Sequence, residues 1–277
     1  MAESPDRRRT IDASADVGRG STAGEGYAVT THLYCVLPPE RRGALPTGLS
    51  GLAGEPVRAL TVEGLVAWVS DVTRNVPVSV DGVRTHDAVV EAALATGSTP
   101  VPARFGQRFE SDDACRDALR SRAASVETLL ADVQGLVEMT LVITPSTHRM
   151  LRDLEPVIPE MFDSAGTGAG RRYLETLRQR EAATGAVKAA MDTLAAALNR
   201  AASAFVRRAA MLDAGTPLPL RTLSHLIARS DVPAYKAAVR AVSAGSELQF
   251  LFIGPRAPYS FSALTDSGGS HGMNLAD

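Results

Sequence analysis

The chain has 277 residues and a mass of 29.1 kDa, which predicts two domains or one domain with a long appendage. Hydrophobic residues make up 45% and charged residues 22%, so the composition is that of a globular protein and excludes wholesale disorder. A net charge of -2 leaves no basic surplus for nucleic-acid binding. The isolated cysteines Cys35 and Cys115 predict neither a disulfide framework nor a zinc site.

The first segment, residues 1–25, is a polar run rich in Gly, Ser and Asp, which predicts a disordered tail. No apolar stretch follows its arginines, so we expect neither a signal peptide nor an anchor. No later window has the roughly 20 apolar residues of a membrane span. A cytoplasmic protein without membrane contact is the expectation.

Strand signals open the ordered part of the chain. Apolar residues alternate along Tyr27–Leu37, which predicts a strand with one face in a core. His32 falls on the less apolar face and is expected to be a surface or pairing histidine. Two further apolar runs, Val57–Val62 and Leu65–Val72, flank Glu63-Gly64, a good hairpin turn.

The next elements complete a first domain over residues 26–145. Helical spacing marks His86–Leu94, and a longer helix is expected over Asp112–Val133 with a short edge strand between them. A last strand is expected at Val137–Ile143. This order predicts an α+β fold whose N-terminal domain is a ferredoxin-like antiparallel sheet with helices on one face.

The stretch Thr99–Phe109 has the most unusual order of residues in the chain. Proline fixes the backbone and removes a donor, so Pro100 and Pro102 predict a short edge strand. Gly106 can adopt a positive φ angle and so allows a sharp turn.

Phe105 and Phe109 are expected to point inward from this turn, which leaves Arg104 as a cation among buried neighbours. A buried guanidinium needs a carboxylate or carbonyl partner. Arg104 is therefore either a structural residue that ties the turn to a nearby element or a residue presented to a ligand or partner protein.

The second half predicts a different unit, over residues 146–264. A short helix is expected up to Leu154, and the run Gly166–Gly170 is read as a flexible connection, because no strand precedes it and no Lys-Ser/Thr pair ends a phosphate-binding pattern. A long helix is expected over Arg171–Leu212. Its heptad stripe predicts a seam against another helix of the chain or against a partner, formed by Val187, Met191, Leu194, Leu198, Phe205 and Leu212.

Beyond this helix, Leu220–Ala228 reads as a strand, Asp231–Ser243 as a helix and Leu248–Ile253 as a strand. Together with the long helix they form a second small α+β unit. Residues 265–277 are rich in Gly and Ser and predict a flexible tail.

No motif in the chain predicts catalysis. The five histidines form no pair at metal-ligand spacing, and no serine or cysteine lies in a nucleophile pattern. We therefore expect a protein that is not an enzyme and that needs no metal or cofactor.

Four motifs in series resemble the gas vesicle protein family GvpL/GvpF over roughly residues 27–264. They are the strand Leu33-Tyr34-Cys35-Val36, the helix that begins near His86 and carries Val89-Val90-Glu91, the segment Pro102-x-Arg104-Phe105-Gly106-x-x-Phe109, and the closing Gly254-Pro255-x-x-Pro258-Tyr259-x-Phe261. The chain departs from the family pattern at Arg256 and Ala257, where Trp and Pro are expected.

The resemblance implies an accessory or minor structural protein of gas vesicles, located in the cytoplasm with the vesicles. It would bind the small hydrophobic shell protein, assist assembly, and contact other gas vesicle accessory proteins. The expected partner-binding residues are Arg104, Phe105, Phe109, Pro258, Tyr259 and Phe261.

Two other functions stay open at this stage. The two ferredoxin-like units would form a small-ligand-binding regulatory module if a metabolite bound in a cleft between them. Nucleic-acid binding on an open sheet ranks last, because the chain has neither a basic surplus nor ribonucleoprotein aromatic motifs.

Overall fold

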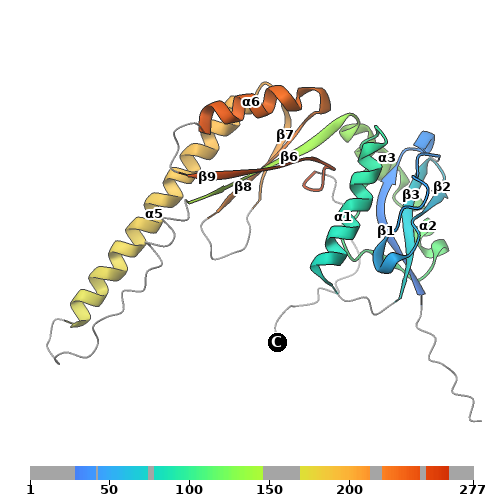
Figure 1. Ribbon diagram of the computed structural model, residues 1–277, viewed down its shortest axis with the longest axis horizontal. Coiled ribbons are helices and arrows are strands. Elements are labelled where there is room, and N and C mark those ends of the chain that lie inside the picture. The colour runs from blue at the N-terminus through green and yellow to red at the C-terminus, as the bar shows by residue number, and fades with distance from the viewer. Residues whose placement is uncertain are drawn as a thin grey trace, which may run out of the picture.

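The computed structural model describes residues 29–41, 43–73, 78–145, 169–212, 220–243 and 248–261. They form two antiparallel sheets with helices packed against them, an α+β fold of two small domains (Figure 1). The predicted fold class is therefore confirmed. The predictions for residues 1–25, 146–168 and 265–277 lie outside the described residues.

The first sheet contains the first four strands that the sequence predicted for the N-terminal domain. Its hairpin turns at Glu63-Gly64, where Gly64 has a φ of +70°. The short fourth strand lies at the edge, as the prolines predict, and a fifth strand also pairs with the first one. In spatial order the sheet contains β2 (Arg58–Val62), β3 (Leu65–Thr73), β1 (Val29–Leu37) and β4 (Val101–Pro102), with β5 (Arg108–Phe109) beside β1.

Serine side chains cap the N-termini of two helices of this domain. Ser79 accepts a hydrogen bond from the backbone N–H of Gly82, and Ser111 accepts one from Ala114. The helix expected over 112–133 is two helices, because the chain breaks at residues 121 and 122. The helices are α1 (Val80–Ala95), α2 (Asp112–Arg120) and α3 (Ala123–Val133).

Helices cover both faces of the first sheet, whereas the sequence predicted helices on one face. A bulge in β1 between Leu33 and Cys35 puts these two side chains on opposite faces. Leu33 packs with residues of α2 and α3, and Cys35 packs with residues of α1. Because β1 is buried on both faces, His32 is buried as well, and the expected surface position is wrong.

The second sheet has β6 (Leu136–Thr144) in its interior. β6 pairs with β8 and β9, so the strand expected at Val137–Ile143 does not complete the first sheet. The boundary at residue 145 stays a prediction. The spatial order is β7 (Val206–Leu212), β8 (Arg221–Ala228), β6 and β9 (Gln249–Arg256).

One face of the second sheet packs against α5 (Ala169–Ala202) and α6 (Val232–Ser243). The predicted seam is confirmed as a core seam of the same chain, because four of its members are buried there: Val187, Met191, Leu194 and Leu198. The expected helix end at Leu212 is wrong. The chain leaves the helix after Ala202, and residues 206–212 form β7, where strand pairing with β8 overrides their helix propensity.

The two domains share buried contacts. Leu226 of β8 and Phe261 belong to the core that lies under α2 and α3. The Thr99 hydroxyl donates to the carbonyl of Leu136 (2.8 Å), which ties the end of the first sheet to β6. No helix in the described ranges has the length and apolar character needed to cross a membrane.

Candidate protein-interaction site

The segment Thr99–Phe109 forms a short strand, a turn and a second short strand at the edge of the first sheet. Both short strands, β4 and β5, pair with β1, the strand next to them in the sheet. The backbone N–H of Gln107 donates to the carbonyl of Arg104 (3.1 Å) and closes the turn. Gly106 has a φ of +88°, which confirms the prediction of a positive φ at this position.

Two phenylalanines anchor the turn on opposite faces of the sheet. Phe105 packs against the core under α1, and its ring centroid lies 6.0 Å from that of His32 and 5.8 Å from that of His86. Phe109 packs against the core under α2 and α3. Both therefore point inward as predicted, and the backbone between them is held from both sides.

Two buried histidine side chains, linked by a hydrogen bond, also fix the turn. His86 Nε2 lies 3.1 Å from the carbonyl oxygen of Ala103, which only accepts, so Nε2 carries the proton. His86 Nδ1 must then accept from His32 Nε2, at 2.9 Å. His32 Nδ1 is buried without a hydrogen-bond partner among the described residues. The hydrogen bonds of His32 and His86 thus connect β1, α1 and the start of the turn.

Both histidines are held neutral by their surroundings. Burial, and then the neighbouring His86 and Arg108, lower the pKa of His32 to about 3. Burial also lowers the pKa of His86, although the bond to Ala103 opposes that shift. A neutral pair is consistent with the hydrogen-bond pattern, because a second proton on His32 would create a buried donor without an acceptor.

Arg104 itself is exposed, so the expected burial of this cation is wrong. Among the described residues its guanidinium has no ion pair and no side-chain hydrogen bond. The reading in which Arg104 ties the turn to a nearby element therefore has no support in the described structure. What the geometry provides is an exposed arginine on a turn that its two neighbouring phenylalanines and the histidine pair hold in place.

Exposed apolar side chains lie at the start of α1, the helix against which this turn packs. Val78, Val80 and Val83 are 76%, 68% and 44% exposed, and we call them the valine surface. The Phe105 ring lies against the same helical turn, since it comes within 3.2 Å of the position that a Cβ on Gly82 would occupy. The turn therefore packs against the helical turn that carries Val80 and Val83.

The closing segment, residues 254–261, packs against its own chain. Pro258 and Phe261 are buried, and Tyr259 is half-buried against the core under α1. Arg256 lies over the Tyr259 ring, with its guanidinium carbon 5.0 Å from the ring centroid, and pairs with Asp87 of α1 at 2.8 Å. At the position where the resemblance led us to expect a Trp, this chain thus has an arginine that links β9 to α1.

A buried carboxylate holds the end of this segment. Glu138 of β6 is 2% exposed and accepts from the backbone N–H of Ser260 (2.8 Å), the Ser260 hydroxyl (2.6 Å) and the Thr140 hydroxyl (3.1 Å). Glu138 forms no ion pair within the described ranges, and these three donors satisfy its buried carboxyl oxygens instead. The arrangement fixes the closing segment between the two sheets.

The sequence did not reveal the role of Glu138, the pairing of Asp87 with Arg256 or the pairing of His32 with His86. One signal for Glu138 was present, because it is a lone carboxylate inside the apolar strand Val137–Ile143. The histidine pair had no local signal, since its members are 54 positions apart in the sequence. The structure does not bring the predicted site residues into one surface, because only Arg104 is exposed among them.

The described ranges contain neither a metal-ligand cluster nor a reactive thiol. They contain no cluster of three or more His, Cys, Asp and Glu side chains that would hold a metal ion. Burial raises the pKa of both thiols, to about 12 for Cys115, so neither Cys35 nor Cys115 is a ready nucleophile at neutral pH.

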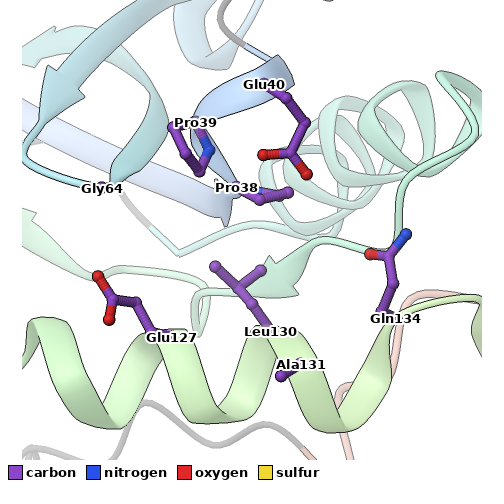
Figure 2. Close-up of a pocket in the computed structure, with 8 residues that line it drawn as sticks. All are labelled: Pro38, Pro39, Glu40, Gly64, Glu127, Leu130, Ala131 and Gln134. Carbon is purple, nitrogen blue, oxygen red and sulfur yellow. The ribbon is translucent and has the colours of Figure 1, made fainter.

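A hollow of about 390 Å³ lies within the first domain rather than between the two domains (Figure 2). Side chains of α3 form one wall, and the β2–β3 turn and the loop after β1 form the other. The lining combines apolar groups with two carboxylates and contains no cation: Pro38, Pro39, Glu40, Gly64, Glu127, Leu130, Ala131 and Gln134. Such a lining offers no anchor for an anionic metabolite.

Comparisons with known proteins agree with the motifs. Residues 30–263 match the family model of the gas vesicle synthesis protein GvpL/GvpF. The chain is 27% identical over 257 residues to gas vesicle protein L of a Streptomyces species, covering 85% of this chain and 93% of that protein.

Two solved structures share the fold. GvpF from Anabaena sp. PCC7120 superposes with a TM-score of 0.66 at 17% identity, covering 88% of this chain and 100% of that one. GvpF from Microcystis aeruginosa gives 0.63 at 18% identity, covering 85% and 99%. The family model spans most of the chain, and the chain therefore belongs to the GvpL/GvpF family of gas vesicle synthesis proteins.

Proposed function

We propose that this protein is an accessory protein of gas vesicles that binds the small hydrophobic shell protein and assists vesicle assembly in the cytoplasm. Membership of the GvpL/GvpF family supports the link to gas vesicles. Other gas vesicle accessory proteins are further partners in this proposal, and neither nucleic acid nor membrane takes part.

The physical task of such a protein is to keep an aggregation-prone subunit soluble until it is added to the shell. A shell subunit with a strongly apolar face associates with other copies through that face or through an unpaired strand edge. A partner that covers this surface reversibly prevents premature association. The partner needs an apolar contact area together with a polar group that fixes the orientation.

The single observation that carries the proposal is the exposed Arg104 on a turn that packs against the start of α1, the helix that carries the valine surface. The turn holds the arginine in place, so little conformational freedom of the backbone is lost on binding. Its guanidinium is available for a carboxylate of the partner, and the three valines supply apolar area. The combination suits a hydrophobic partner segment that carries an acidic residue.

We assign different roles to the other predicted site residues. Phe105 and Phe109 hold the turn from its two sides and so position Arg104. Pro258, Tyr259 and Phe261 pack inside the molecule and hold the closing segment against α1 and the first domain. Their substitution is expected to act on partner binding through the stability of the fold.

The test is co-expression of the tagged full chain with the shell protein of the same genome, followed by purification of a soluble complex. Substitution at exposed positions is preferable to deletion of residues 99–109, because deletion would remove β4, β5 and both phenylalanine anchors. Arg104→Ala and the pair Val80→Ser/Val83→Ser are expected to reduce recovery of the shell protein. Arg120→Ala is the matched control, since it removes an exposed arginine from α2 on the opposite side of the sheet.

Recovery of the complex with the wild-type chain, and its loss with the Arg104 and valine variants only, would support the proposal. If the shell protein stays insoluble with every variant and with the wild-type chain, the proposed binding is wrong. If all variants recover it equally, binding occurs elsewhere and the assigned surface is wrong.

A further inference from the structure

The first half of α5 projects beyond the second sheet (Figure 1). The helix runs from Ala169 to Ala202, but its buried seam begins only at Val187. Every side chain described between residues 171 and 186 is exposed. At 1.5 Å per residue, the 18 residues 169–186 form an arm about 27 Å long, and none of its described side chains is buried.

A helical arm whose described side chains are all exposed is costly for a protein to maintain. Helices of this length are marginally stable alone in water, and Gly185 lowers the helix propensity by about 1 kcal/mol relative to Ala. The arm also exposes Leu174 (56%) and Leu177 (37%). A partner that covers these leucines would stabilise the arm.

One face of the arm has the spacing of a helix-pairing surface. Leu174, Arg178, Glu181 and Gly185 follow each other at intervals of four, three and four residues, so they lie in one stripe, which we call the arm face. With 3.6 residues per turn, Val187 lies about 140° around the helix from Leu174. A helix that binds the arm face would therefore not collide with the sheet under the core seam.

The order of residues on the arm face is complementary to itself in the antiparallel direction. A two-fold axis between residues 179 and 180 places Arg178 of each copy opposite Glu181 of the other. The same axis places Leu174 opposite Gly185, where the space that a Cβ would occupy has no atom within 4 Å. Leu177 then lies opposite Ala182, another small residue.

The parallel arrangement lacks these matches. It would place Arg178 opposite Arg178 and Glu181 opposite Glu181, and like charges at facing positions are unfavourable. It would also leave the space at Gly185 unfilled, since glycine would face glycine. We therefore propose that the arm of α5 binds the arm of a second copy of this chain as an antiparallel helix pair.

The decisive experiment is sedimentation equilibrium of the full chain with reciprocal charge exchange. The wild-type chain is expected to dimerise reversibly. Arg178→Glu alone and Glu181→Arg alone should each weaken the dimer by about tenfold or more, because each creates a like-charge pair across the axis. The double variant Arg178→Glu/Glu181→Arg should restore the wild-type dissociation constant.

Two further variants separate pairing from folding. Arg120→Glu changes the net charge as Arg178→Glu does, but on α2, and should leave the dimer unchanged. Gly185→Ala should strengthen the helix of the monomer yet weaken the dimer, since the added methyl group occupies the space of the partner's leucine.

A wild-type chain that stays monomeric at all accessible concentrations would overturn the proposal. A dimer that neither single charge variant weakens, or that the double variant does not restore, would overturn it as well. Circular dichroism of each variant verifies that a lost dimer reflects lost pairing in a folded chain.

Discussion

Acidification should destabilise this protein through its buried histidines, and His32 offers the clearest test. His32 is fully buried, and its pKa is lowered from 6.5 to about 3. Below pH 6.5 the unfolded chain therefore binds a proton at this residue that the folded chain does not bind. Stability must fall as the pH decreases from about 6.5 toward the folded pKa, and it is fully present above that range.

The magnitude follows from the shift. With an unfolded pKa of 6.5 and a folded pKa of about 3, lowering the pH from 7 to 5 costs about 2 kcal/mol at His32. His225 is buried against α5 and α6, and burial lowers its pKa to about 4, which gives a similar loss over the same interval. A domain is stable by about 5–15 kcal/mol, so the sum is a large fraction.

The assay is urea unfolding at a series of pH values for the wild-type chain and for His32→Gln. The glutamine amide keeps a donor near the position of Nε2 but does not titrate. The variant should lose about 2 kcal/mol less than the wild type between pH 7 and pH 5, whatever its stability at pH 7. Parallel curves for the two proteins would refute the reasoning, because they would mean that His32 titrates with an ordinary pKa in the folded state.

Three further predictions concern backbone, thiols and the closing segment. Gly106→Ala should destabilise the fold by about 1 kcal/mol because of its positive φ, whereas Gly185→Ala should stabilise it by about 0.5–1 kcal/mol at concentrations where the chain is monomeric, both measured by denaturant unfolding. Cys35 and Cys115 should resist a thiol reagent in the native protein and react once urea unfolds it; rapid native labelling would contradict their burial. Glu138→Gln should cost about 2 kcal/mol and increase hydrogen exchange in the closing segment, since it removes a charged acceptor; unchanged exchange would contradict the role of this carboxylate.

Features that depend on local backbone chemistry could be predicted from the sequence. The edge strand at Val101, the hairpin at Glu63-Gly64 and the turn at Gly106 all follow from what proline and glycine allow or forbid. The seam from Val187 to Leu198 followed from helical spacing, because a helix that packs on a sheet needs one continuous apolar stripe.

Features that depend on contacts distant in the sequence could not be predicted. The apolar pattern of residues 137–143 predicts a strand but not which strands pair with it. The pairing of β6 with β8 and β9 therefore could not be predicted from the sequence. Helices bury both faces of β1, and the bulge after Leu33 shifts its side-chain alternation, whereas alternation alone predicts a single buried face. The helix propensity of residues 206–212 led to the prediction of a helix, whereas pairing with β8 stabilises these residues as a strand.

The candidate site shows the same division. The importance of the Arg104 turn was inferred from its order of residues, but the exposure of the arginine was not. Pairing of the turn with β1 directs Phe105 and Phe109 to opposite faces, and the residue at the tip remains outside both cores.

The most direct test of the central claim is site-specific crosslinking to the shell protein. A photo-crosslinking amino acid replaces Arg104 in one protein and Arg120 in a second, and each protein is co-expressed with the shell protein. The proposal predicts a crosslinked product from position 104 and little from position 120. Equal crosslinking from both positions, or crosslinking from position 120 alone, would contradict the assignment of the Arg104 turn as the contact with the shell protein.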